Sequence, residues 1–240
     1  MVISAHVMIL LAFLAALPAT CCVGWLVIRI PFWMDPSWLD LDAVPASGVK
    51  PINQGTMPIP AQSSVPFHRS CAWVFLSLGV LFACSALKWG PSMTLVTSML
   101  LISMLMTLAW IDIRTGLLPD VLTKSGAAIG LIVHAWAGWA PFSSAVIGCF
   151  GGYLSLWVFF QLYRIATHKV GMGYGDFKLF AMLGAWLGWE SLAPILLVAS
   201  LSAMAVAVVG IAIKRLTLQS TMPFGPYLAF GGILRLFDWI

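Results

Sequence analysis

Three aspartates that lie against long apolar runs are the first sign of chemistry in this sequence. The chain has only eight Asp and Glu residues among its 240 residues, and Asp112, Asp120 and Asp176 each border an apolar run. An ionisable group at such a place is costly, and it is by default a candidate for function. One isolated aspartate could merely mark the end of a helix, but a pair suggests a reaction.

Two carboxyl groups held close together cannot both ionise cheaply, so they share a proton. The ionised group can act as a general base on water while the protonated group polarises a peptide carbonyl. This is the chemistry of aspartic proteolysis, which needs no metal, nucleophilic side chain or cofactor. The sequence contains neither H-E-x-x-H nor G-x-S-x-G. Its four histidines are isolated, which favours core or interface roles for His6, His68, His134 and His168.

The stretch GMGYGDFKLF, residues 171–180, places Asp176 directly after three glycines. Because Gly173 and Gly175 have no Cβ, we expect the backbone here to take positive φ and to approach another chain closely. An extended substrate could hydrogen-bond to such a turn. By itself, a G-x-G-D tetrapeptide is also consistent with a simple loop before a helix.

The composition predicts that these aspartates belong to a polytopic membrane protein. Hydrophobic residues make up 61% of the chain and charged residues 8%, whereas about a quarter of a soluble domain is charged. The five cysteines lie in or beside apolar segments without any C-x-x-C pair, so they indicate neither a zinc site nor a disulfide framework. The net charge of +4 comes from basic residues scattered singly, which argues against nucleic-acid binding.

A membrane-spanning helix needs roughly 20 apolar residues, and the sequence predicts an all-α transmembrane bundle of about eight spans. The predicted spans lie at about 7–30, 71–87, 91–111, 121–138, 142–163, 177–189, 191–213 and 223–238. The run in residues 1–30 lacks a basic segment before it, so we expect a retained first span rather than a signal peptide. Residues 31–70 are predicted to form one extramembrane loop, and residues 71–240 the membrane-embedded core.

The distribution of Lys and Arg predicts the orientation of the bundle. With the N-terminus and the C-terminus outside, every Lys and Arg except Lys88 and Arg235 lies on the cytoplasmic side. Asp112, at the end of the third span, and Asp176, at the start of the sixth, then both lie near the cytoplasmic border of the membrane. Water reaches that border far more easily than the centre of the bilayer.

At this point the residues match a known family. IDIRTGLLPD, residues 111–120, and GMGYGDFKLFAMLGAWLGW, residues 171–189, resemble the type IV prepilin peptidases, which are G-x-G-D membrane aspartic proteases. VIRIP at 27–31 and PFGPYLAFGG at 223–232 add to the resemblance. Motif and predicted context agree, which is the test that such a match must pass.

The resemblance implies a multi-pass enzyme of the bacterial inner membrane whose active site faces the cytoplasm. It would cut the basic leader from type IV prepilins or type II secretion pseudopilins after a glycine. By motif position, Asp112 and Asp176 carry over as the catalytic pair. Four further motif positions carry over as backbone or supporting residues: Gly173, Gly175, Lys178 and Asp120.

Many relatives also N-methylate the new N-terminus with S-adenosylmethionine, and here the sequence departs from the family pattern. Typical members carry two C-x-x-C pairs in the first cytoplasmic loop, whereas residues 31–70 contain no cysteine. Only Arg69 and Cys71, in PFHRSCAW, stand where a basic stretch would end. We therefore expect no zinc, and S-adenosylmethionine only if methyl transfer is retained.

Two other function classes stay open. A proton-coupled membrane transporter could use Asp112 and Asp176 as a relay, although transporters tend to show internal repeats and broken helices at the midplane, and no repeat is visible here. A non-catalytic assembly subunit of a secretion machine would tolerate the loss of either carboxylate. The oligomeric state and the pilin system served are not determined by the sequence.

Overall fold

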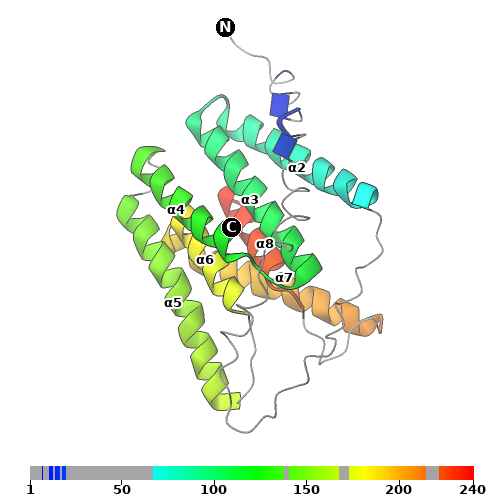
Figure 1. The fold of residues 1–240 in the computed structure, drawn as a ribbon, viewed down its shortest axis with the longest axis vertical. Coiled ribbons are helices and arrows are strands. Elements are labelled where there is room, and N and C mark those ends of the chain that lie inside the picture. The colour runs from blue at the N-terminus through cyan, green and yellow to red at the C-terminus, as the bar shows by residue number, and fades with distance from the viewer. Residues whose placement is uncertain are drawn as a thin grey trace.

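The computed structural model describes residues 7, 11–12, 14–16, 18–19, 67–137, 141–167, 173–214 and 222–240. In these residues every regular element is a helix, as predicted (Figure 1). The elements from residue 67 onward are α2 (Phe67–Trp89), α3 (Met93–Thr115), α4 (Asp120–Ala137), α5 (Phe142–Thr167), α6 (Tyr174–Leu187), η2 (Trp189–Ser191), α7 (Leu192–Ala212) and α8 (Gly225–Leu236). Of the predicted first span at 7–30, residues 7, 11–12, 14–16 and 18–19 are described, and all of them are helical, whereas the predicted loop at 31–70 lies outside the described residues except for the backbone of 67–70.

Three helices in the described part of the chain are long and apolar enough to cross a membrane: α3, α5, and the segment Trp189–Ala212 that joins η2 to α7. Helices α6 and α8 contain 14 and 12 residues. At about 1.5 Å per residue they are only about 21 and 18 Å long, shorter than a hydrocarbon core of about 30 Å. The chain is thus a helical membrane protein, whereas the count of eight spans and the orientation stay predictions.

Helix α6 lies at the centre of the bundle, in contact with α4, α5, α7 and α8. From Asp176 to Trp186 all of its side chains are buried except that of Lys178. This burial explains why the α6 sequence is apolar on every face rather than along one stripe. The first turn of α6, which contains Asp176, is therefore held from several sides.

Glycines set the distance between α6 and α5. A Cβ at Gly148 of α5 or at Gly184 of α6 would overlap the backbone of the other glycine, and a Cβ at Gly152 would lie 2.9 Å from the carbonyl oxygen of Phe180. Small residues allow membrane helices to pack this closely. The contact fixes the depth and rotation of α6, and so the position of Asp176.

The turn between α3 and α4 brings two of the three aspartates to one end of the bundle. Helix α3 ends where Gly116 adopts a left-handed conformation with φ of 66°, and its N–H donates to the carbonyl of Asp112 over 2.8 Å. Glycine is favoured at this position because a side chain is strained there. Helix α4 begins at Asp120 after only three intervening residues, so the chain reverses almost at once.

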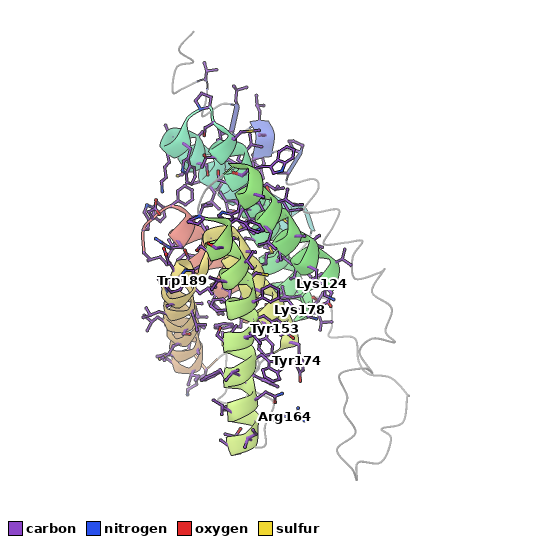
Figure 2. The ribbon with its side chains drawn as sticks, turned by 90° about the vertical axis from the view of Figure 1, so that its left-hand side faces the viewer. Lys124, Tyr153, Arg164, Tyr174, Lys178 and Trp189 are labelled. Atoms are coloured by element: carbon purple, nitrogen blue, oxygen red, sulfur yellow. The ribbon has the colours of Figure 1, made fainter. Side chains whose placement is uncertain are left out.

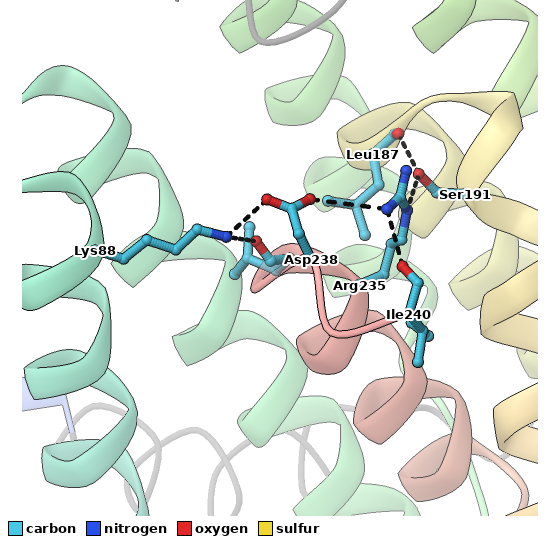
Figure 3. Close-up of polar contacts among 7 residues, drawn as sticks. Lys88, Leu187, Ser191, Arg235, Asp238 and Ile240 are labelled. Carbon is cyan, nitrogen blue, oxygen red and sulfur yellow. Dashed lines mark hydrogen bonds and ion pairs between the residues drawn. The ribbon is translucent and has the colours of Figure 1, made fainter.

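The opposite end of the bundle is closed by a second set of charges (Figure 3). Lys88, near the end of α2, pairs with Asp238 over 2.8 Å, and Arg235, in the last turn of α8, donates to the Ser191 hydroxyl over 3.1 Å. Because α8 starts beside Asp112 and finishes here, Lys88 and Arg235 lie at the end remote from that aspartate. Lys88 and Arg235 thus share one end of the bundle, while the side of the membrane on which they lie stays a prediction.

Candidate active site

Asp112 lies in the last turn of α3 and is buried, with 4% of its surface exposed. Its Oδ2 accepts a hydrogen bond from the backbone N–H of Gly225 over 2.9 Å. Gly225 is the first residue of α8, so a helix start meets a helix end at this carboxylate. Helix α3 supplies the acid, and α8 supplies a donor that holds it.

Asp176 lies in the first turn of α6 and is 7% exposed. The amino end of a helix carries partial positive charge, which favours a carboxylate at this position. Its backbone N–H donates to the carbonyl of Gly173 over 3.2 Å, which begins the helix. The two carboxyl groups lie close enough for Asp112 to act electrostatically on Asp176. The structure therefore brings together the two aspartates that the sequence predicted as a pair.

The expectation of positive φ at the motif glycines is wrong. Gly173 is extended, with φ of −78° and ψ of 143°, and Gly175 is part of α6. Another part of the chain does approach Gly175 closely, but it is a segment of the protein itself and not a substrate. A Cβ at Gly175 would lie 2.8 Å from the Cβ of Leu118, in the turn between α3 and α4. Glycine at 175 is thus required by packing against Leu118 and not by backbone conformation.

Asp120 and Lys178 form a second contact between the same two segments. The Lys178 ammonium lies 2.6 Å from Oδ1 of Asp120, and the Lys124 ammonium lies 2.9 Å from its Oδ2. Lys178 is the better buried partner, whereas Lys124 is exposed. Leu118, in the turn between α3 and α4, and Asp120, at the start of α4, thus contact the first two turns of α6.

Aromatic side chains of α5 and α6 form a wall beside Asp176. The ring centroid of Phe160 lies 5.3 Å from that of Tyr174 and 5.5 Å from that of Phe177, and Tyr153 meets Phe177 edge to face at 6.2 Å. Rings at such distances and tilts stabilise one another beyond their buried area. Figure 2 shows Tyr153 and Tyr174 along the same side of the molecule as Lys178. These contacts restrain Tyr174 and Phe177, which lie on either side of Asp176 in the sequence.

Sequence reasoning missed two residues of this site, Gly225 and Leu118. The stretch PFGPY, residues 223–227, contributed to the resemblance, but no role was assigned to its glycine. Gly225 lies 113 residues from Asp112 and Leu118 lies 57 residues before Gly175, so no local pattern connects either pair. The one available signal was a glycine between two prolines in an otherwise apolar run.

His134 has the core role that the sequence predicted for its histidines. It is buried in α4, and its Nε2 lies 2.7 Å from the carbonyl oxygen of Trp186. The indole N–H of Trp186 donates back to the carbonyl of Gly126 over 2.8 Å. The other three histidine side chains lie outside the described set. Within the residues that the structure describes, no three His, Cys, Asp or Glu side chains gather as a metal site would require.

The fold and the site define a helical membrane protein with a buried pair of aspartates near one end. Residues 99–208, which contain both aspartates, match the model of the Type IV leader peptidase family. Through this region the chain is similar to the members of that family. The resemblance stated from the motifs is thereby confirmed.

Named relatives agree with this assignment. A "Prepilin leader peptidase/N-methyltransferase" of Pectobacterium carotovorum subsp. carotovorum is 42% identical over 155 residues, which are 65% of this chain and 56% of the relative. Proteins of the same name from Burkholderia pseudomallei (strain K96243) and Legionella pneumophila are 41% and 37% identical, over 68% and 73% of this chain and 52% and 61% of their own length. The chain thus matches little more than half the length of these curated relatives. No solved structure gives a significant match.

Proposed function

We propose that this protein is a membrane aspartic endopeptidase that removes the basic leader from type IV prepilins or type II secretion pseudopilins. The observation that carries the proposal is that Asp112 and Asp176 are both buried, one at the end of α3 and one at the start of α6, close enough for the charge of Asp112 to act on Asp176. The family match and the names of the relatives support the same activity.

In the proposed reaction one carboxylate accepts a proton from water while the water oxygen adds to the carbonyl carbon of the scissile peptide. The protonated partner donates to the carbonyl oxygen, which gives a tetrahedral diol. As the C–N bond breaks, the carboxyl group that took the proton from water gives it to the departing nitrogen, and the other carboxyl group, now ionised, takes a proton from a diol hydroxyl. The products are a leader with a new carboxylate and a pilin with a new N-terminal amine. Asp112 and Asp176 supply both groups, and the proton stays shared between them.

The supporting residues act through the position of Asp176. Leu118 packs on Gly175, and Asp120 pairs with Lys178, so residues on both sides of Asp176 are tied to the loop after Asp112. Gly173 begins the helix through its carbonyl. In this proposal the ties fix the separation of the two carboxyl groups within the narrow range that proton sharing demands.

The proposed location is the bacterial inner membrane, with the aspartate end of the bundle facing the cytoplasm. Basic side chains at the helix ends near the aspartates favour this orientation by the positive-inside rule. In the described chain they are Arg114, Lys124, Arg164, Lys178 and Lys214. A basic leader would stay on the cytoplasmic side by the same rule, next to the aspartates.

Methyl transfer is a second candidate activity, favoured by the N-methyltransferase in the names of the relatives. It would require S-adenosylmethionine, whereas the proteolytic reaction requires no cofactor. The loop in which the sequence lacks the usual cysteines lies outside the described residues, apart from the backbone of 67–70. Incubation with labelled S-adenosylmethionine and cleaved pilin tests this activity directly.

The proteolytic function is tested with purified protein in lipid vesicles and a full-length prepilin. We expect cleavage by the wild type, and a loss of at least about a thousandfold in kcat for Asp112→Asn and for Asp176→Asn, because each removes one of the two proton-transfer groups. Asp238→Asn is the matched control, since it changes an aspartate at the opposite end of the bundle. Full activity in either active-site variant rejects the proposal and leaves the assembly-subunit alternative. A proton flux that depends on both aspartates, without cleavage, indicates the transporter.

A further inference from the structure

We propose that Gly225 is a positioning residue for Asp112: its backbone N–H fixes one carboxylate oxygen, and its missing side chain makes room for that carboxylate. The inference rests on the proposed peptidase function and deepens it. It makes the start of α8 part of the active site, although α8 contributes no acidic side chain to the pair.

The hydrogen bond between Gly225 and Asp112 is short and buried. The Gly225 nitrogen lies 2.9 Å from Asp112 Oδ2, and both residues are buried. A hydrogen bond to an ionised acceptor is stronger than one between neutral groups, and it favours the charged form of the carboxylate. A buried acceptor that loses its donor also bears the full cost of desolvation. The N–H of Gly225 therefore fixes the orientation of the Asp112 carboxyl group and offsets part of the cost of ionising it in a buried place.

The space around Gly225 excludes a side chain. A Cβ there would lie 2.7 Å from Oδ2, 3.1 Å from Cγ and 3.4 Å from Cβ of Asp112. The first of these distances is closer than real Cβ contacts, so either the carboxylate or the start of α8 would have to move. Glycine is needed here for close approach, since Gly225 is not among the glycines with positive φ.

The start of α8 explains why its first N–H is available to Asp112. The first N–H groups of a helix have no partner within the helix. Pro226 has no N–H, and those of Tyr227 and Leu228 donate to the carbonyl of Phe224 over 3.1 and 3.2 Å. Phe224, at the N-cap position, makes no side-chain capping bond. Asp112 thus takes the place of a capping side chain, at the helix end where negative charge is favoured.

Packing along α8 makes its first residue a fixed reference point. A Cβ at Gly232 would lie 2.5 Å from Leu183 of α6, and one at Gly231 would lie 2.8 Å from the carbonyl oxygen of Ile195 in α7. The helix is therefore held closely against two neighbours in its second half. An N–H donor at the start of such a helix is preorganised, as a group that orients a catalytic carboxylate must be.

The first test compares Gly225→Ala with Gly151→Ala in the prepilin cleavage assay. Both changes add one methyl group to a helical glycine, but a Cβ at Gly151 of α5 would meet nothing within 4 Å, whereas one at Gly225 would meet Asp112. We expect Gly225→Ala to lower kcat by about tenfold or more, the effect of losing a hydrogen bond to a charged group, with KM changed less than about twofold. We expect Gly151→Ala to leave kcat within about twofold of the wild-type value. Equal kcat values for the two variants would overturn the proposal.

The second test removes the N–H without adding an atom to the site. Replacement of Gly225 by glycolic acid converts the amide to an ester, which keeps the carbonyl of residue 224 and deletes the donor to Asp112. We again expect kcat to fall by about tenfold, and this variant decides the question if Gly225→Ala does not fold. An ester variant as active as the wild type would show that the hydrogen bond has no positioning role. The peptidase function fails separately, and only if the wild type does not cleave or Asp112→Asn still does.

Discussion

At both ends of the bundle, aspartates contact helices that are distant in the sequence. The two ends differ in whether the aspartates are exposed and paired with basic side chains. At one end Asp238 has 72% of its side chain exposed and lies between Lys88 and Arg235 (Figure 3). At the other end Asp112 and Asp176 are buried, and within the described chain neither takes part in an ion pair. The exposed, paired aspartate closes the fold. We expect the buried pair to lower stability, as groups kept for chemistry commonly do.

Replacing a buried aspartate by asparagine should have the largest effect on cleavage. It should also raise the stability of the protein, whereas most substitutions lower it. We expect Asp176→Asn to abolish cleavage and to raise the free energy of unfolding by about 1–2 kcal/mol, because a buried amide avoids the desolvation cost of a carboxylate. The same holds for Asp112→Asn, whose side-chain oxygen can still accept from Gly225. Thermal unfolding in detergent, followed by tryptophan fluorescence, measures the change. A lower midpoint than that of the wild type would mean that the carboxylate stabilises the bundle.

Breaking the tie between Asp120 and Lys178 should have an intermediate effect. We expect Lys178→Met to lower kcat about tenfold, equivalent to about 1.4 kcal/mol in the barrier, because α6 loses its ion pair with the first residue of α4. Lys178→Arg should restore most of the activity. Lys124→Met is the matched control, since Lys124 pairs with the same aspartate from the exposed side. Equal effects of Lys178→Met and Lys124→Met would indicate that Asp120 needs only neutralisation, not this particular tie.

Breaking the pair at the opposite end should have the smallest effect. Lys88→Met removes a partly exposed ion pair with Asp238, and such pairs contribute about 0.2–1 kcal/mol. We expect a shift of that size in the free energy of unfolding, with kcat unchanged. A double-mutant cycle with Asp238→Asn isolates the pair. A change in kcat would reveal coupling between the two ends, which the comparison does not predict.

The apolar runs predicted where the helices lie, but they did not always predict where a helix ends. The predicted third span stops at residue 111, where the charged residues begin, whereas α3 continues to Thr115. The predicted fifth span stops at 163, whereas α5 continues to Thr167. In both places the helix extends past the apolar run, because hydrogen bonding and caps such as Gly116 end a helix, and hydrophobicity ends only its buried part.

The two aspartates could be predicted because each is recognised by its own neighbours in the sequence. The residues that hold them in place could not be predicted in this way. Asp112 and Asp176 each border an apolar run, and charge near such a run is conspicuous in any sequence. The contacts of Gly225 with Asp112 and of Leu118 with Gly175 depend on how three helices pack. Gly175 shows the difference well, since its presence was correctly noted, whereas its packing against Leu118 was not foreseen.

Helix α5 extends well beyond the start of α6. The ring of Phe160 packs against that of Tyr174, in the first turn of α6, and α5 continues for seven residues beyond Phe160 to Thr167, which is about 10 Å at 1.5 Å per residue. The end of α5 therefore projects about two helical turns past the first turn of α6 (Figure 1). A peptide in extended form, at about 3.3 Å per residue, would need about three residues to span that part of α5.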